Sequence, residues 1–196
     1  FMQFPLYFTF KISTLTNDFR VHDASGREMA FVSQKLFRMK EEIHVFSSEE
    51  KTQLILKIKA DSWLDFSTTY RFLDADDREM GCIARQGMRS LWKASYQIYD
   101  EKGQPDFAVN EENAMVKVFD GIFGDLPVIG LFSGYFFNPS YLVTRPDGTQ
   151  IARLQKEKSF FGRRFTVHKL AEFDSGEENR IIPGLMMMIL LERSRG

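Results

Sequence analysis

The 196-residue sequence predicts a mainly β fold, namely a twelve-stranded closed antiparallel barrel that encloses a hydrophobic C-terminal helix. Three observations predict it. Apolar and polar residues alternate with a period of two along most of the chain, turn-forming residues interrupt this alternation, and the C-terminal segment is apolar on every side. An eight-stranded barrel is filled by its own side chains, whereas about twelve strands leave room for a helix about 10 Å in diameter.

The strands are predicted from faces that alternate between apolar and polar residues. Between residues 51 and 60, for example, Leu54, Leu56 and Ile58 fall on one face and polar side chains fall on the other. The twelve predicted strands cover residues 4–11, 18–23, 28–33, 35–47, 51–60, 66–74, 79–86, 90–99, 104–110, 139–145, 149–157 and 163–172.

A weak internal repeat marks several turns between these strands. An aromatic residue, alternating apolar positions and a turn-forming cluster recur in segments 19–26, 70–77, 96–103 and 141–148. Each copy predicts a hairpin, because Asp, Asn and Gly adopt the backbone angles of tight turns. The second copy contains Asp74 and Asp77 but fails as a calcium loop, since Glu79 stands where the loop needs glycine.

Two segments depart from the strand pattern. Residues 110–123 begin with Asn110, a good helix N-cap, and place apolar residues at helical spacing, which predicts a short amphipathic helix on the sheet. Near the C-terminus, Glu177 and Glu178 precede the apolar run Ile181–Leu191, and Pro183 lies near the start of that run. These features predict a second helix.

The second helix is apolar all round, so we expect it to be enclosed on every side. Its nine large apolar side chains contribute roughly 1.5 to 3 kcal/mol each when buried, which together exceeds about 10 kcal/mol. The run is too short to span a bilayer, because eleven helical residues rise about 16 Å against a hydrocarbon core of about 30 Å. We therefore expect a filled barrel whose recognition surfaces lie outside.

The charge of the chain is nearly balanced, with 26 Lys and Arg residues against 27 Asp and Glu residues and an isoelectric point of about 6.4. This balance argues against a nucleic-acid partner. The single cysteine excludes an internal disulfide and favours a reducing compartment, so we expect a cytoplasmic protein that can bind a membrane peripherally. Cys82 shares a strand face with Met80 and Ala84, which predicts a buried structural thiol.

No motif of nucleophilic, phosphate-binding or metal-binding chemistry occurs in the sequence. His22, His44 and His168 lie on different predicted strands without the spacing of metal ligands. We therefore expect no cofactor, no metal and no catalytic activity. An active site assembled from distant residues is the remaining alternative.

A basic window at residues 153–169 is the strongest candidate site. Six cations are set against Glu157 alone, and two phenylalanines stand at the tip of the hairpin that the window predicts. The cations are Arg153, Lys156, Lys158, Arg163, Arg164 and Lys169, and the tip residues are Phe160 and Phe161. Such a group can dock on an anionic membrane surface. The alternative is a solvated strand pair whose phenylalanines fold back into the mouth of the barrel.

An acidic window at residues 100–125 has the opposite balance, with seven acids against two lysines. Two opposed patches would favour self-association or a charged protein partner. The alternative is that these acids cap helices and build turns.

Two stretches and the C-terminus resemble a known family. Residues 110–124 (NEENAMVKVFDGIFG) and 127–141 (PVIGLFSGYFFNPSY) resemble the LURP-one-related proteins, and residues 187–196 (MMILLERSRG) are similar to their C-terminal helix. This family shares the tubby C-terminal-like fold with the phospholipid scramblases. The resemblance covers nearly the whole chain and implies a single tubby C-terminal-like domain over residues 1–196, with twelve strands around a hydrophobic helix.

The resemblance implies little about activity. Its relatives range from phosphoinositide-binding regulators and proposed lipid scramblases to plant defence-associated proteins. The residues themselves favour a non-enzymatic module that binds anionic phospholipid headgroups or a membrane surface through the basic window. The alternatives are a protein-interaction or scaffold domain without a small ligand and, third, an enzyme.

Overall fold

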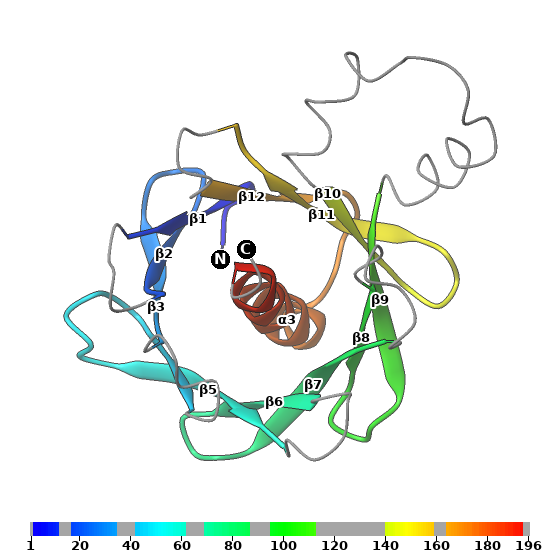
Figure 1. The fold of residues 1–196 in the computed structure, drawn as a ribbon, viewed down its shortest axis with the longest axis horizontal. Helices are drawn as coiled ribbons and strands as arrows, with labels where there is room; N and C mark the ends of the chain where they lie inside the picture. Colours follow the sequence, from blue (N-terminus) through cyan, green and yellow to red (C-terminus); the bar gives the residue numbers. More distant parts are fainter. Residues whose placement is uncertain are drawn as a thin grey trace.

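The computed structural model describes residues 2–11, 17–34, 42–61, 69–86, 95–112, 140–158 and 164–193. These residues form a closed ring of twelve antiparallel strands around one helix (Figure 1). The strands are β1 (Leu6–Phe10), β2 (Phe19–His22), β3 (Glu28–Ser33), β4 (Ile43–Phe46), β5 (Leu54–Ala60), β6 (Thr69–Asp74), β7 (Glu79–Arg85), β8 (Ser95–Tyr99), β9 (Pro105–Glu111), β10 (Ser140–Thr144), β11 (Gln150–Lys156) and β12 (Arg164–Lys169). The predicted fold class is confirmed, and a strand lies within each of the twelve predicted ranges. Residues 35–41, 66–68, 90–94, 139 and 163 of those ranges lie outside the described residues, and the last strand ends at Lys169 and not at residue 172.

Each strand pairs with its neighbours in the sequence, and β1 pairs with β12 to close the ring. Alternation along each strand decides which side chains fill the interior. In β1, Leu6, Phe8 and Phe10 are buried, whereas Tyr7 and Thr9 between them are only partly buried on the outer face. This alternation lines the inside of the barrel with apolar side chains.

The five connections between strands that the structure describes completely lie at one end of the barrel, which we call the turn end. Three of them begin with an aspartate whose carboxylate accepts hydrogen bonds from two backbone N–H groups. Asp23 accepts from Ser25 at 3.0 Å and from Arg27 at 3.1 Å, and Asp74 and Asp100 accept in the same way from the residues two and four positions later. The repeat seen in the sequence is therefore a repeat of turns.

The helix α3 spans Ser175–Arg193 and begins six residues before the apolar run. Its start is fixed by a capping box, in which Asp174 Oδ1 accepts from the Glu177 N–H at 2.8 Å and Glu177 Oε2 accepts from the Asp174 N–H at 2.9 Å. Pro183 consequently lies inside the helix and not near its start. All residues from 181 to 191 are buried.

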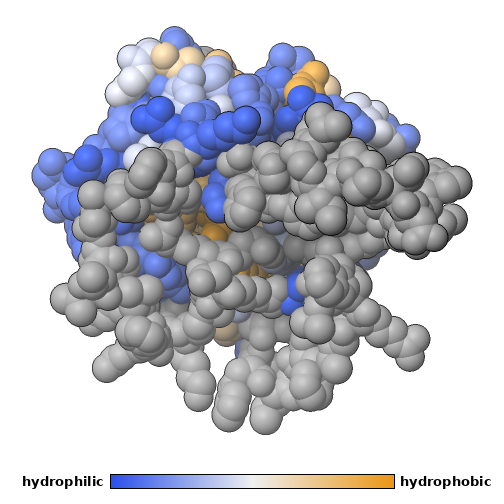
Figure 2. All heavy atoms as spheres, turned by 45° about the horizontal axis from the view of Figure 1, so that its top comes forward, coloured by the Kyte–Doolittle hydropathy of each residue, from blue (hydrophilic) through white to orange (hydrophobic). Residues whose placement is uncertain are grey.

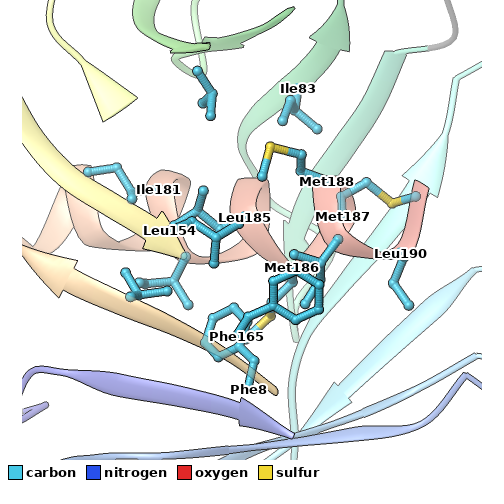
Figure 3. Packing of buried hydrophobic residues seen from close by; sticks show 14 of the residues in the cluster. Phe8, Ile83, Leu154, Phe165, Ile181, Leu185, Met186, Met187, Met188 and Leu190 are labelled. Atoms are coloured by element: carbon cyan, nitrogen blue, oxygen red, sulfur yellow. The ribbon is translucent and has the colours of Figure 1, made fainter. Parts of the chain in front are cut away.

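The helix approaches β7 and β8 most closely. Glycines allow this approach, because a Cβ atom on Gly81 of β7 would stand 2.9 Å from the Cδ atom of Arg180 in the helix. Aromatic rings occupy the other side of the interior, where the ring centres of Phe10 and Phe19 are 4.9 Å apart. Figure 3 shows Met186 on the side of the helix that faces Phe165, with Ile83 on the opposite side.

Two expectations need correction. Asn110 does not cap a helix, because it lies in β9, pairs with Ser95 and accepts a 2.8 Å hydrogen bond from the Ser95 hydroxyl. Residues 113–123 of the predicted helix lie outside the described part of the chain. Cys82 is partly buried on the outer face of β7 and not inside the barrel, since Gly81 and Ile83 take the inward positions.

Candidate anion-binding surface

The basic window forms the strand pair β11–β12. The register of this pair places the predicted cations on different faces and at different ends of the barrel. Lys156 pairs with Phe165, and Lys169 pairs with Ala152. Both lysines therefore stand at strand positions that face the barrel interior, but at opposite ends of the barrel. Arg153 is paired with His168 on the outer face. The window is therefore not one continuous patch.

Of the five predicted cations that the structure describes, two have acidic partners. Arg153 Nη2 lies 2.9 Å from Glu112 Oε1, and Lys169 Nζ lies 2.6 Å from Glu172 Oε2. The Lys169 ammonium group also lies 4.6 Å from the ring centre of Phe173. These contacts tie strands and loops together, which leaves both side chains less available to a ligand.

Three cations gather at the end of the barrel opposite the turn end. Lys156 is partly buried, Lys158 and Arg164 are exposed, and no ion pair joins them to an acid within the described ranges. The Arg164 guanidinium carbon lies 5.9 Å from the ring centre of Tyr7. Arg163, Phe160 and Phe161 lie outside the described residues.

Closure of the barrel extends this group with cations from the N-terminal strands. Thr9 of β1 pairs with Arg164 of β12 on one side and with Arg20 of β2 on the other, so two arginines flank one threonine on the outer face. Lys11 follows two residues after Thr9. Hydrophilic residues dominate the described part of the face drawn in Figure 2.

Sequence reasoning missed Lys11 and Arg20, since they are remote from the basic window along the chain. Alternation places Thr9 on the outer face of β1, and the same alternation continued to Lys11, just after the strand, was a usable signal. The register of the closing strand pair decides their neighbours, however, and no pattern in the sequence gives that register.

The acids of the second window mostly have structural partners. Asp106 Oδ2 accepts from Arg180 Nε at 2.6 Å, Glu112 accepts from the Ser140 hydroxyl at 2.8 Å, and Asp100 builds a turn. Asp120 and Asp125 lie outside the described ranges.

The part of the chain that the structure describes contains no group of three or more His, Cys, Asp or Glu side chains arranged to hold a metal ion. Burial raises the pKa of the Cys82 thiol, and the carboxylate of Glu79 adds to that effect. A raised pKa disfavours the thiolate, which is the reactive form of cysteine. Within the described residues, no helix is long and apolar enough to cross a membrane.

The family model described as LURP-one-related matches residues 28–174. A search of curated proteins finds no match.

Proposed function

The chain belongs to the LURP-one-related family, which is part of the tubby C-terminal-like superfamily, and from this premise we propose that it is a non-catalytic module that binds anionic phospholipid headgroups. Lys156, Lys158 and Arg164 make the contact, and the protein binds the membrane peripherally from the cytoplasm. Proteins of this family are not known to be catalytic, which supports a binding role.

The filled interior carries the proposal. The eleven consecutive buried residues Ile181–Leu191 occupy the interior that a barrel of this size would otherwise offer to a ligand. Recognition is thereby directed to the outside of the barrel. At the end opposite the turns, Lys156, Lys158 and Arg164 have no ion pair with an acid among the described residues.

The size of the expected effect follows from electrostatics. Each Lys or Arg near an anionic membrane contributes about 1 kcal/mol, so three of them contribute about 3 kcal/mol. This amounts to about a 100-fold change in affinity. The attraction falls as salt is added, because Lys158 and Arg164 are exposed to solvent and Lys156 is only partly buried.

Flotation with vesicles that contain phosphatidylserine tests the proposal. We expect the fraction of bound protein to rise with phosphatidylserine content, to fall with salt and to be lost in Lys156→Ala/Lys158→Ala/Arg164→Ala. Absence of binding at low salt would remove the proposal.

A matched control separates the site from the net charge of the protein. Arg27→Ala/Arg78→Ala/Lys102→Ala removes the same number of cations from the turn end. We expect this variant to bind as the parent does. An equal loss in both triple variants would mean that only net charge matters, and would contradict a site at Lys156, Lys158 and Arg164.

A further inference from the structure

The turn between β4 and β5 carries a carboxylate that bridges a lysine just after β1 and an arginine of β2. Glu49 Oε1 accepts a hydrogen bond from Lys11 Nζ, and Glu49 Oε2 accepts one from Arg20 Nη2. The exposed fractions of the three side chains are 38% for Lys11, 39% for Arg20 and 33% for Glu49. This partial burial makes the ion pairs less screened than fully exposed ones.

An aromatic ring lies beneath these charges. Phe31 points outward from β3, yet it is only 2% exposed. The ammonium groups of Lys11 and Lys51 lie 5.8 and 5.7 Å from its ring centre. An aromatic face attracts cations, so Phe31 holds Lys51 beside the same ring as Lys11, the lysine that contacts Glu49.

This group offers more hydrogen-bond donors than Glu49 accepts. Arg20 Nε is shielded from solvent and has no hydrogen-bond partner among the described residues. Lys51 Nζ donates a hydrogen bond to the Ser33 hydroxyl at 3.3 Å. Among the described residues, it makes no hydrogen bond to Glu49. The two oxygens of the Glu49 carboxylate therefore do not satisfy all the N–H donors of Arg20 and Lys51.

The charges are also only partly compensated. Glu50 is the second acid of the turn, and its pKa is lowered chiefly by a hydrogen bond from the Ser48 hydroxyl, with a smaller contribution from the charge of Arg20. Lys11, Arg20 and Lys51 thus face one bridging carboxylate and one carboxylate engaged elsewhere. A phosphate monoester brings nearly two negative charges and three acceptor oxygens, which suits this donor set better.

We propose that Lys11, Arg20 and Lys51 form a binding site for a phosphate monoester, and that Glu49 occupies this site as an internal competitor. The phosphate replaces the carboxylate on Lys11 and Arg20, and the Glu49 side chain moves away from them, while Lys51 of the same turn stays beside Phe31. The site uses none of Lys156, Lys158 and Arg164, so it does not depend on the proposed headgroup contact, although Arg20 neighbours Arg164 across Thr9.

An NMR titration with inorganic phosphate at constant ionic strength tests the site. We expect saturable shifts of the backbone amide signals of Lys11 and Arg20. In Glu49→Gln, which keeps the shape of the side chain and removes its charge, the affinity should rise about two- to fivefold, as expected for loss of a partly exposed ion pair. Arg20→Gln should abolish the saturable shifts.

Glu50→Gln is the matched control, since it removes the same charge from the adjacent position. We expect a smaller gain in affinity than in Glu49→Gln. Equal gains in the two variants would show a general charge effect and overturn the proposal. It would also be overturned if Glu49→Gln gave no saturable shift, or if Arg20→Gln kept the affinity of the parent while thermal unfolding showed it to be folded.

A second arm distinguishes a lipid source of the phosphate from a soluble one. Phosphatidic acid carries a phosphate monoester, whereas phosphatidylserine carries a diester. If the ligand is a lipid, Glu49→Gln should float with phosphatidic acid vesicles more than with phosphatidylserine vesicles of equal charge, and Arg20→Gln should cancel the difference. Phosphate binding in solution without that difference would support the site and assign it to a soluble ligand.

Discussion

Gly184 of the central helix meets Ile98 of β8 so closely that a Cβ atom on the glycine would stand 2.7 Å from the Ile98 Cδ1 atom. Ile83 of β7 is the next neighbour, at 3.8 Å from the same position. The helix therefore packs against β7 and β8 at a glycine, where the absence of a side chain permits the close contact.

Enlarging Gly184 should separate the helix from β8. Gly184→Val adds a branched side chain to a filled core and is expected to lower the free energy of unfolding by about 1 to 3 kcal/mol. Gly184→Ala should cost less, because the Ile98 methyl group can rotate and alanine favours the helix by about 1 kcal/mol. Urea denaturation measures both variants. Ile98→Ala should recover part of the loss in Gly184→Val, and a valine variant as stable as the parent would contradict this packing.

A partly buried ion pair attaches the start of the helix to the turn between β10 and β11. Arg145 donates from Nε at 3.0 Å and from Nη2 at 2.8 Å to Glu177 Oε1, and the two side chains are 26% and 17% exposed. We expect Glu177→Gln to lower the free energy of unfolding by about 1 to 2 kcal/mol, since the pair is charge-assisted and shielded. A double-mutant cycle with Arg145→Gln should show less than additive losses. Strict additivity would mean that the pair contributes nothing.

The aspartate turns should make the barrel sensitive to acid. The Ser25 hydroxyl and the N–H groups of Ser25 and Arg27 lower the pKa of Asp23 below its usual value. A lowered pKa in the folded state adds stability above about pH 4, and this stability is lost as the pH falls through the folded-state value. Asp23→Asn keeps an acceptor oxygen and removes the charge, so thermal unfolding of this variant should depend less on pH between about pH 5 and pH 2. Asp76→Asn is the control, and equal pH dependence in Asp23→Asn and the parent would refute this origin.

A charge inside the barrel should prevent folding. Leu190 is 1% exposed, and Leu190→Asp would place an unpaired carboxylate among apolar side chains. We expect this variant to be insoluble or unfolded by circular dichroism. Leu170→Asp makes the same change at a position that is 42% exposed and should remain folded. A folded Leu190→Asp would be incompatible with an enclosed helix.

The alternation of single strands was enough to predict the ring of twelve. In β5, Leu56 and Ile58 point inward as the pattern requires, and turns such as the one at Asp74 were marked by their own residues. These signals are local, because a strand and its turn are specified by adjacent residues. The helix start was predicted too late, since Asp174 and Glu177 form a capping box that draws polar residues into the helix.

The proposed anion-binding surface could be predicted only in part. Lys156, Lys158 and Arg164 are close in sequence, so a charge count found them. The neighbours Arg20 and Arg164 come together through the register of Thr9 in β1, which is a property of the closed ring. The Glu49 contact depends in addition on how one turn folds over the outer face.

Amide hydrogen exchange across Ile181–Leu191 tests most directly whether the helix fills the barrel. If it does, these amides can exchange only when the barrel opens, so their free energies of exchange should equal those of the most protected strands and the free energy of global unfolding. Exchange several orders of magnitude faster than in β7 and β8, under conditions where those strands stay protected, would show that the helix leaves the interior and would contradict a recognition surface confined to the outside.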